Sequence, residues 1–305
     1  MRGVFCVCTF ATLRFSPYFC ANIPHRAASS PKATVRTPPL VLFFSTMKIL
    51  ITGAAGFVGC RATRFLGLSH QVIPLDSRQL DITDEQRVQT LFMDHAPKAV
   101  GTLNVARAAA AVGAKLIYAG SDQVYNGCAT SAPHDEDTRL SPRGVYARIK
   151  YRTECEVQAL LPTAVCLRLS WMYDVPNSPL RQNRGLLLRL LESAQHSTPF
   201  AASTHECRGI TNVWQVVRRI EAAIGLPGGI YNFGSPNHRS TYDTVLEAAR
   251  FLTAAGHLEA GAPAPVCAVE QPERNLSMSL KRIEQFGLTF PDTITGLKTA
   301  LLHGA

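Results

Sequence analysis

A short apolar segment followed by three evenly spaced glycines constrains this chain more than any other feature. Residues 48–52, Lys-Ile-Leu-Ile-Thr, form the kind of apolar run that makes a buried parallel strand. Gly53, Gly56 and Gly59 follow at once, and residues 57–68 are compatible with a helix. In this order the glycines permit a tight turn, a close approach of backbone to a diphosphate, and close packing of the helix. The segment therefore predicts a dinucleotide site at the helix N-terminus, with an ordinary glycine turn as the alternative.

A second predicted strand supplies the acidic residue that such a site needs. Residues 72–75 lead into Asp76, 23 residues after the first glycine, close to where a ribose-binding carboxylate is expected. Ser77 and Arg78 follow and offer a place for a 2′-phosphate, so NAD and NADP both remain open. Residues 80–84, Leu-Asp-Ile-Thr-Asp, are typical of the turn that covers an adenine. The predicted cofactor contacts from these segments are Gly53, Gly56, Phe57, Val58, Gly59, Asp76, Arg78, Asp81 and Ile82.

The predicted sheet contains an anomaly beside this site. A strand starts at residues 97–100, yet a helical pattern already begins at residue 101 and continues through the strong helix formers of residues 107–111. A doubly wound fold needs a full fourth strand here, because that strand lies beside the first at the centre of the sheet. Strands usually run about 5–6 residues. We therefore predict a fourth strand that is truncated near Val100. Three explanations are open: the gene is mis-spliced or wrongly predicted, the chain is an inactive isoform, or the site is reorganised.

Three polar residues downstream have the types and spacing of a catalytic group. Residues 115–120 are typical of a buried strand, and the strand ends at Ser121. Tyr146 and Lys150 are four residues apart, which places them on one face of a predicted helix. Of the eight tyrosines, only Tyr146 has a lysine four residues later. Beside a nucleotide site this pattern favours catalysis over a chance surface pair. The predicted catalytic residues are Ser121, Tyr146 and Lys150.

Several motifs in a fixed order connect these features from residue 52 to residue 288. They are residues 52–59, 80–84, 114–122, 124–127, Tyr146 with Lys150, 167–173, 274–281 and 286–288. In this order they resemble an extended short-chain dehydrogenase/reductase. Within that superfamily the chain is most similar to the dTDP-4-dehydrorhamnose reductase branch, which also contains the regulatory β subunit of methionine adenosyltransferase.

The resemblance implies an α/β fold, namely a Rossmann-type doubly wound parallel sheet with a smaller C-terminal α/β substrate lobe. We expect residues 47–175 to form the NAD(P)-binding domain. Residues 176–305 are expected to form the substrate-binding lobe, with residues 209–233 returning to the sheet. Residues 1–46 are expected to lie outside the fold as a leader that is disordered or cleaved.

The resemblance also implies an oxidoreductase that uses NADP or NAD to reduce a keto group of a nucleotide-linked sugar. Tyr146 would donate a proton to the developing alkoxide, and Lys150 would supply a nearby cation and hold the nicotinamide ribose. Ser121 would hydrogen-bond the carbonyl. Two of the candidate substrate contacts have a structural alternative. Trp171 could instead be a residue of the core, and Arg208 could instead be an ordinary surface arginine. The candidate substrate contacts are Asp122, Tyr125, Trp171 and Arg208.

Two departures from the family pattern keep other functions open. Gln123 stands where the reductase branch usually has an aromatic residue, which bears on the choice of substrate. The segment missing after Val100 would have contained the asparagine of the family's proton relay, and Asn104 is not an obvious replacement. The alternatives are a non-catalytic NADP-binding regulatory subunit, similar to methionine adenosyltransferase β and bound to a synthetase, and a nucleotide-sugar epimerase or dehydratase.

Charge and cysteine content argue against several other classes of protein. The formal net charge is +9, but residues 1–46 hold five basic and no acidic residues. Without a stripe of Lys and Arg interleaved with aromatics, nucleic-acid binding is not expected. No apolar run approaches the ~18 residues that span a bilayer. Nine scattered cysteines without a C-x-x-C pair, and histidines without ligand spacing, predict free thiols and no metal site.

The first 46 residues bear on location. Their basic, serine-containing and acid-free composition resembles an organelle transit segment, which would place the protein in mitochondria or plastids. Residues 4–13 are compatible with the apolar part of a secretory signal, although free cysteines argue against export. Translation from Met47 would instead predict a cytoplasmic protein. A homodimer is as compatible with the sequence as a synthetase partner.

Overall fold

The computed structural model describes residues 9–12, 46–82, 84, 86, 88, 90, 102–183 and 185–303. A six-stranded sheet runs through its centre in the order β10-β5-β4-β1-β2-β3. All neighbouring pairs that exclude β1 are parallel, which confirms the predicted Rossmann-type α/β sheet. Its parallel strands are β2 (Lys48–Thr52), β3 (Gln71–Leu75), β4 (Lys115–Ser121), β5 (Val165–Leu169) and β10 (Gly229–Phe233).

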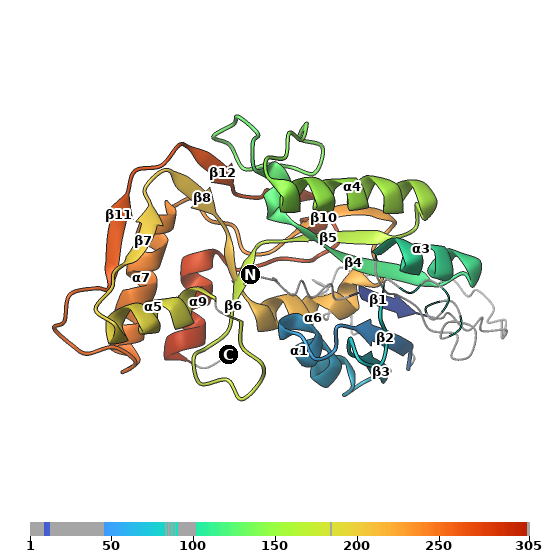
Figure 1. Ribbon diagram of the computed structural model, residues 1–305, viewed down its shortest axis with the longest axis horizontal. Helices are drawn as coiled ribbons and strands as arrows, with labels where there is room; N and C mark the ends of the chain where they lie inside the picture. Colours follow the sequence, from blue (N-terminus) through green and yellow to red (C-terminus); the bar gives the residue numbers. More distant parts are fainter. Residues whose placement is uncertain are drawn as a thin grey trace, which may run out of the picture.

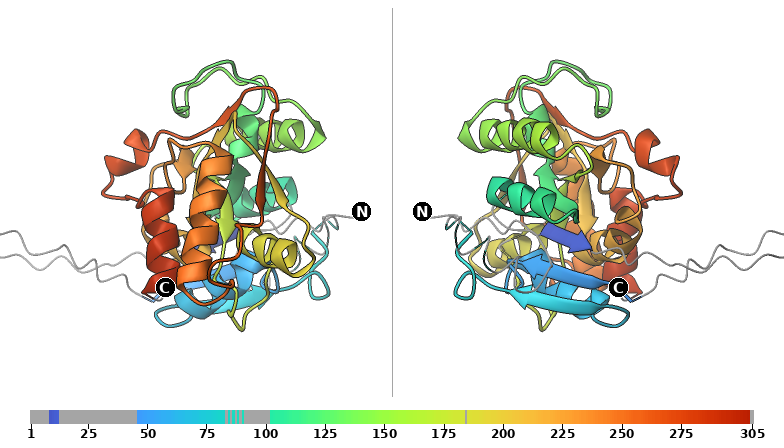
Figure 2. Two further views of the ribbon diagram at one scale, coloured as in Figure 1. Left: turned by 90° about the vertical axis from the view of Figure 1, so that its left-hand side faces the viewer. Right: turned by 90° about the vertical axis from the view of Figure 1, so that its right-hand side faces the viewer.

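Helices cover both faces of this sheet (Figures 1 and 2). On one face α1 (Phe57–Leu66) and α6 (Val213–Ala223) share a core with Ile49 and Ile51 of β2. On the other face α3 (Thr102–Ala111) and α4 (Val145–Leu160) pack around Leu50. The three apolar residues of β2 are fully buried, as expected for a strand covered on both faces.

The first strand differs from the prediction for the leader. Thr9–Thr12 forms β1, which lies antiparallel between β2 and β4. Phe10 pairs with Ile51 on one side and with Ile117 on the other. The prediction that all of residues 1–46 lie outside the fold is therefore wrong for this strand. A gap between β2 and β4 would leave backbone N–H and C=O groups without partners, and β1 fills it. The truncated strand expected at residues 97–100 lies outside the described residues.

The C-terminal half adds a second layer of helices and short strand pairs at one end of the sheet. The chain leaves the main sheet at Ser170, because β5 ends at Leu169 and the next strand, β6 (Trp171–Tyr173), pairs with β9 (Ile210–Asn212). The strand β11 (Val266–Val269) is followed by β12 (Arg274–Leu276). The remaining elements are η1 (Asp122–Tyr125), α5 (Leu186–Gln195), β7 (Phe200–Ser203), β8 (Glu206–Arg208), α7 (Thr241–Ala254), α8 (Lys281–Glu284) and α9 (Thr293–Leu302).

The packing of this end explains why its elements stay together. In Figure 2, α7 and α9 lie side by side. Buried apolar residues of α5, α7 and α9 meet Phe200 and Ile210 in a core separate from those of the sheet. The strand β10, by contrast, joins the main sheet beside β5. The domain boundaries at residues 47 and 176 stay predictions.

Candidate active site

The glycine-rich turn brings the start of α1 onto the end of β2. Gly53 has a φ of +60°, which glycine adopts readily and other residues avoid. The turn is closed by a 2.8 Å hydrogen bond from the Gly56 N–H to the Gly53 carbonyl. A Cβ on Gly59 would lie 2.1 Å from that same carbonyl oxygen. The first and third glycines therefore each meet a steric need, and the free N–H groups of α1 are held at the edge of the sheet.

A cavity of about 400 Å³ lies over this turn. Asp76 lines it at the end of β3, and its Oδ1 accepts the backbone N–H groups of Arg78 at 2.9 Å and Gln79 at 3.1 Å. These bonds hold the carboxylate at the position where a ribose is expected. Of the predicted cofactor residues, those that line this cavity are Gly53, Gly56, Phe57, Asp76, Asp81 and Ile82.

Three further predicted cofactor residues lie elsewhere. Val58 lines a neighbouring cavity, and Gly59 packs behind the turn. The exposed Arg78 is not among the lining residues of either cavity. The structure adds Arg181, Gln182 and Asn183, which sequence reasoning missed. They lie in a polar loop without a recognisable motif, so no signal in the sequence marks them.

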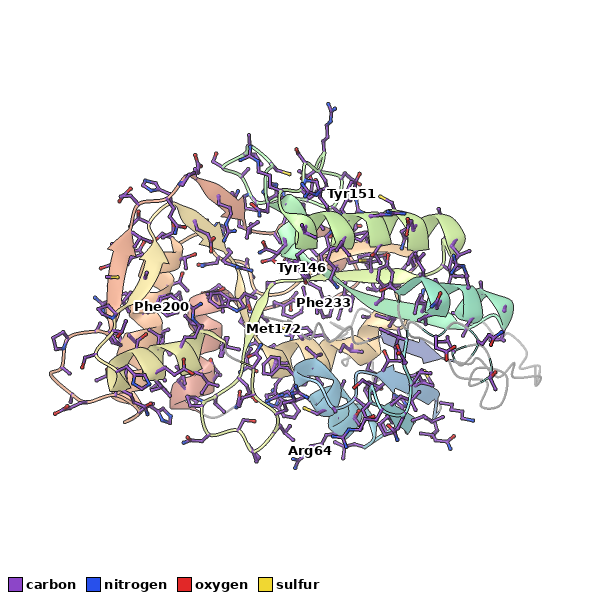
Figure 3. All side chains as sticks on the ribbon, in the orientation of Figure 1. Arg64, Tyr146, Tyr151, Met172, Phe200 and Phe233 are labelled. Atoms are coloured by element: carbon purple, nitrogen blue, oxygen red, sulfur yellow. The ribbon has the colours of Figure 1, made fainter. Side chains whose placement is uncertain are left out.

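The second cavity, also about 400 Å³, brings the predicted catalytic residues together. Ser121 ends β4, while Tyr146 and Lys150 occupy the first turns of α4. Figure 3 shows Tyr146 and Met172, which both line this cavity, near the middle of the molecule. Asn183 lines both cavities, so the two adjoin at this residue.

The environment of Tyr146 favours the protonated phenol. Burial raises the pKa of Tyr146 above its usual value, and the Asp122 carboxylate raises it further. A hydrogen bond with Ser121 and the Arg208 charge lower the pKa in part. The Lys150 ammonium lies 5.9 Å from the centre of the Tyr146 ring and donates a 2.8 Å hydrogen bond to the Ala119 carbonyl. A phenol that keeps its proton at neutral pH, beside a cation, suits the donation of a proton.

Three of the four candidate substrate contacts meet at the mouth of this cavity. Arg208 Nη2 lies 2.6 Å from Asp122 Oδ2, and the guanidinium carbon lies 5.1 Å from the centre of the Trp171 ring. Arg208 Nε is buried without a hydrogen-bond partner among the described residues. The Arg208 side chain is also 12% exposed and lines the cavity, so it can contact an anionic or carbonyl group of a ligand there.

Tyr125 does not belong to this group, and its prediction as a substrate contact is wrong. Its side chain is fully buried and is not among the residues that line the cavity. The hydroxyl accepts a 2.7 Å hydrogen bond from Arg168 and lies 2.8 Å from Asn232 Oδ1. The ring stacks on His134 at 4.5 Å. Tyr125 is thus a core residue whose polar atom is satisfied by protein partners.

The described part of the chain contains no cluster of three or more His, Cys, Asp or Glu side chains able to hold a metal ion. Six cysteines fall within this part, and all are free thiols. No helix among the described residues is long and apolar enough to cross a membrane.

Comparison with known proteins matches the chain to one family model, the RmlD substrate binding domain, over residues 47–101 and 98–295. The two pieces meet where the sequence predicts a truncated strand. A dTDP-4-dehydrorhamnose reductase from Mycolicibacterium smegmatis is 33% identical over 150 residues, covering 41% of this chain and 46% of the relative. The chain thus spans about half the length of the first curated relatives it matches.

Two further proteins match over more of their length. The methionine adenosyltransferase 2 subunit beta of Xenopus laevis is 26% identical over 283 residues, covering 79% of this chain and 83% of that protein. The crystal structure of the dTDP-4-dehydrorhamnose reductase from Bacillus anthracis, in complex with NADP, superposes with a TM-score of 0.71. The two sequences are 20% identical, and the superposition covers 84% of this chain and 97% of the Bacillus anthracis chain. This similarity shows the fold.

Proposed function

Because the chain belongs to the RmlD substrate binding domain family, we propose that it is an NAD(P)-dependent reductase of a keto group on a nucleotide-linked sugar. The observation that carries the proposal is the arrangement of Ser121, Tyr146 and Lys150 around one cavity. That cavity adjoins the cavity over the glycine turn at Asn183. A ligand that extends from one cavity to the other would place its reactive end beside the three polar groups.

The residues over the turn fit a dinucleotide. The first turn of α1 directs backbone N–H groups toward a diphosphate, and a side chain on Gly59 would clash with the Gly53 carbonyl. Asp76 offers a carboxylate to ribose hydroxyls. When bound, the nicotinamide supplies the hydride for the reduction.

The chain's own residues would bind the substrate and move the proton. The Tyr146 hydroxyl would donate its proton to the oxygen of the substrate carbonyl, and the Ser121 hydroxyl would hydrogen-bond that same oxygen. Lys150, held by the Ala119 carbonyl, would offset the charge left on the phenolate. Arg208, Asp122 and Trp171 would hold the sugar and its diphosphate at the mouth.

Reduction of a nucleotide-linked 4-keto sugar, followed by the loss of NADPH or NADH absorbance, tests this function. We expect oxidation of the cofactor that depends on the sugar and saturates with its concentration. Oxidation that is absent for every keto sugar tried, although the protein binds the cofactor, would contradict the assignment as a reductase.

The length of the match to the Xenopus laevis β subunit supports a second candidate. In this alternative the chain binds NADP without catalysis and regulates a synthetase, and the two cavities hold the dinucleotide alone. Co-purification with a methionine adenosyltransferase, at the same strength in wild type and in Tyr146→Phe, would favour this subunit role over the reductase.

The choice between NADH and NADPH should depend on Asp76. We expect Asp76→Ala to shift the ratio of the two dissociation constants toward NADPH by roughly tenfold, because the variant removes a negative charge that repels a 2′-phosphate. Calorimetric titration of both cofactors measures this ratio.

The neighbouring variant Arg78→Ala serves as the counterpart in this experiment. Arg78 is exposed beside Asp76, and its loss should weaken NADPH binding while leaving NADH binding unchanged. An unchanged ratio in Asp76→Ala would show that this carboxylate does not contact the adenine ribose.

A further inference from the structure

The loop between β6 and α5 contributes Arg181, Gln182 and Asn183 to the lining of the cavity over the glycine turn. Arg181 from this loop is the sole cationic side chain among the described residues that line the cavity. Its Nη1 donates a 3.3 Å hydrogen bond to the carbonyl of Ala55, inside the turn itself. A positive charge thus lies against the segment whose backbone N–H groups would face a diphosphate.

A buried arginine of α1 fixes the position of this loop. Arg61 is fully buried, and its Nε donates a 2.9 Å hydrogen bond to Asp174 at the start of the loop. Its Nη2 donates to Ser178 Oγ at 3.3 Å, and its Nη1 donates to the Arg181 carbonyl at 3.0 Å. Its guanidinium carbon also lies 4.5 Å from the centre of the Phe57 ring. Since separating a buried ion pair is costly, the loop is held in a fixed position beside the turn.

We propose that Arg181 binds the diphosphate of the cofactor, an assignment that rests on the proposed dinucleotide binding. The glycine turn offers a diphosphate only backbone N–H groups, whereas a guanidinium adds a charge-assisted, bidentate contact. The present partner of Arg181 is a neutral carbonyl at a long distance. Exchanging that partner for a phosphate oxygen strengthens the interaction, because the guanidinium then faces an opposite charge and can bind two oxygens in a bidentate manner.

The place of Arg181 favours the diphosphate over a 2′-phosphate. Its contact atom belongs to Ala55, within the turn between Gly53 and Gly56. The ribose that would carry a 2′-phosphate is expected at Asp76, on the neighbouring strand. Both NADH and NADPH contain the diphosphate, so Arg181 should act on the two cofactors alike.

The experiment is calorimetric titration of NADH and NADPH into the full chain and into Arg181→Gln. We expect about 10- to 100-fold weaker binding of both cofactors, with the ratio between them unchanged. Arg181→Lys should recover part of the affinity, because it restores the charge without the bidentate geometry. The control is Arg64→Gln, which removes an exposed arginine of α1 that lines neither cavity and should leave both affinities unchanged (Figure 3).

The possible results separate this assignment from the proposed function. Equal affinities of wild type and Arg181→Gln would overturn the role of Arg181 and leave dinucleotide binding standing. A loss confined to NADPH would also overturn it, because the residue would then contact a 2′-phosphate. A wild-type chain that binds neither cofactor would overturn both.

Discussion

Replacing Tyr146 by phenylalanine should lower kcat for reduction of the keto sugar by about 10²- to 10⁴-fold, the range that general acid catalysis contributes. The variant removes the proton donor and keeps the ring in the cavity. Binding of NADH or NADPH should change little, since the other cofactor contacts remain. Steady-state kinetics with a nucleotide-linked 4-keto sugar measures kcat, and calorimetry measures the cofactor affinity.

Tyr151 provides a matched control on the same helix. It also lies on α4, but it is 37% exposed and points away from the cavity (Figure 3). Tyr151→Phe should therefore retain the wild-type kcat. If Tyr146→Phe retained it as well, Tyr146 would not be the proton donor, and the assignment of the catalytic group would fail.

Replacing Arg168 by methionine should lower the free energy of unfolding by about 3–5 kcal/mol, which is typical when one partner of a buried ion pair is removed. Arg168 and Glu154 are each 1% exposed, and Arg168 Nη2 lies 2.8 Å from Glu154 Oε2. Arg168 also donates a 2.7 Å hydrogen bond to the Tyr125 hydroxyl. The variant would leave the Glu154 carboxyl buried without its cation. Unfolding by urea, followed by circular dichroism, measures the loss.

Two further variants test this explanation. Arg152 and Glu156 form an exposed ion pair on α4, the helix that carries Glu154. Arg152→Met should therefore change the free energy of unfolding little. Adding Glu154→Gln to Arg168→Met removes the buried charge and should restore part of the lost stability. A loss in Arg168→Met no larger than in Arg152→Met would show that the buried pair is not stabilising.

The elements around the site were predicted where short-range rules decide the structure. The strand β2, the turn and α1 follow from an apolar run and three glycines, whose steric roles the structure displays. The spacing of Tyr146 and Lys150 follows from helix periodicity, and both residues line one cavity. In each case the residues that carry the prediction are close together in the sequence.

The features that were missed depend on contacts between residues far apart in the chain. Arg181 meets Ala55 across 126 positions, and Tyr125 meets Asn232 across 107. Neither the position of Arg181 in a polar loop nor that of Tyr125 shortly after β4 tells which distant segment will pack against the side chain. The strand β1 was missed for a related reason, because its composition resembles a transit segment and only the space between β2 and β4 gives it partners.

The anchoring of the β6–α5 loop by Arg61 has a consequence for the kinetics of cofactor exchange. A loop held by a buried ion pair cannot swing away from α1 as a lid, because opening would expose Arg61 and Asp174 together. Entry and exit of a dinucleotide would then require only rotation of surface side chains such as Arg181, which occurs within nanoseconds. Association should accordingly be limited by diffusion and orientation, and the residence time by the contacts made once the cofactor is bound.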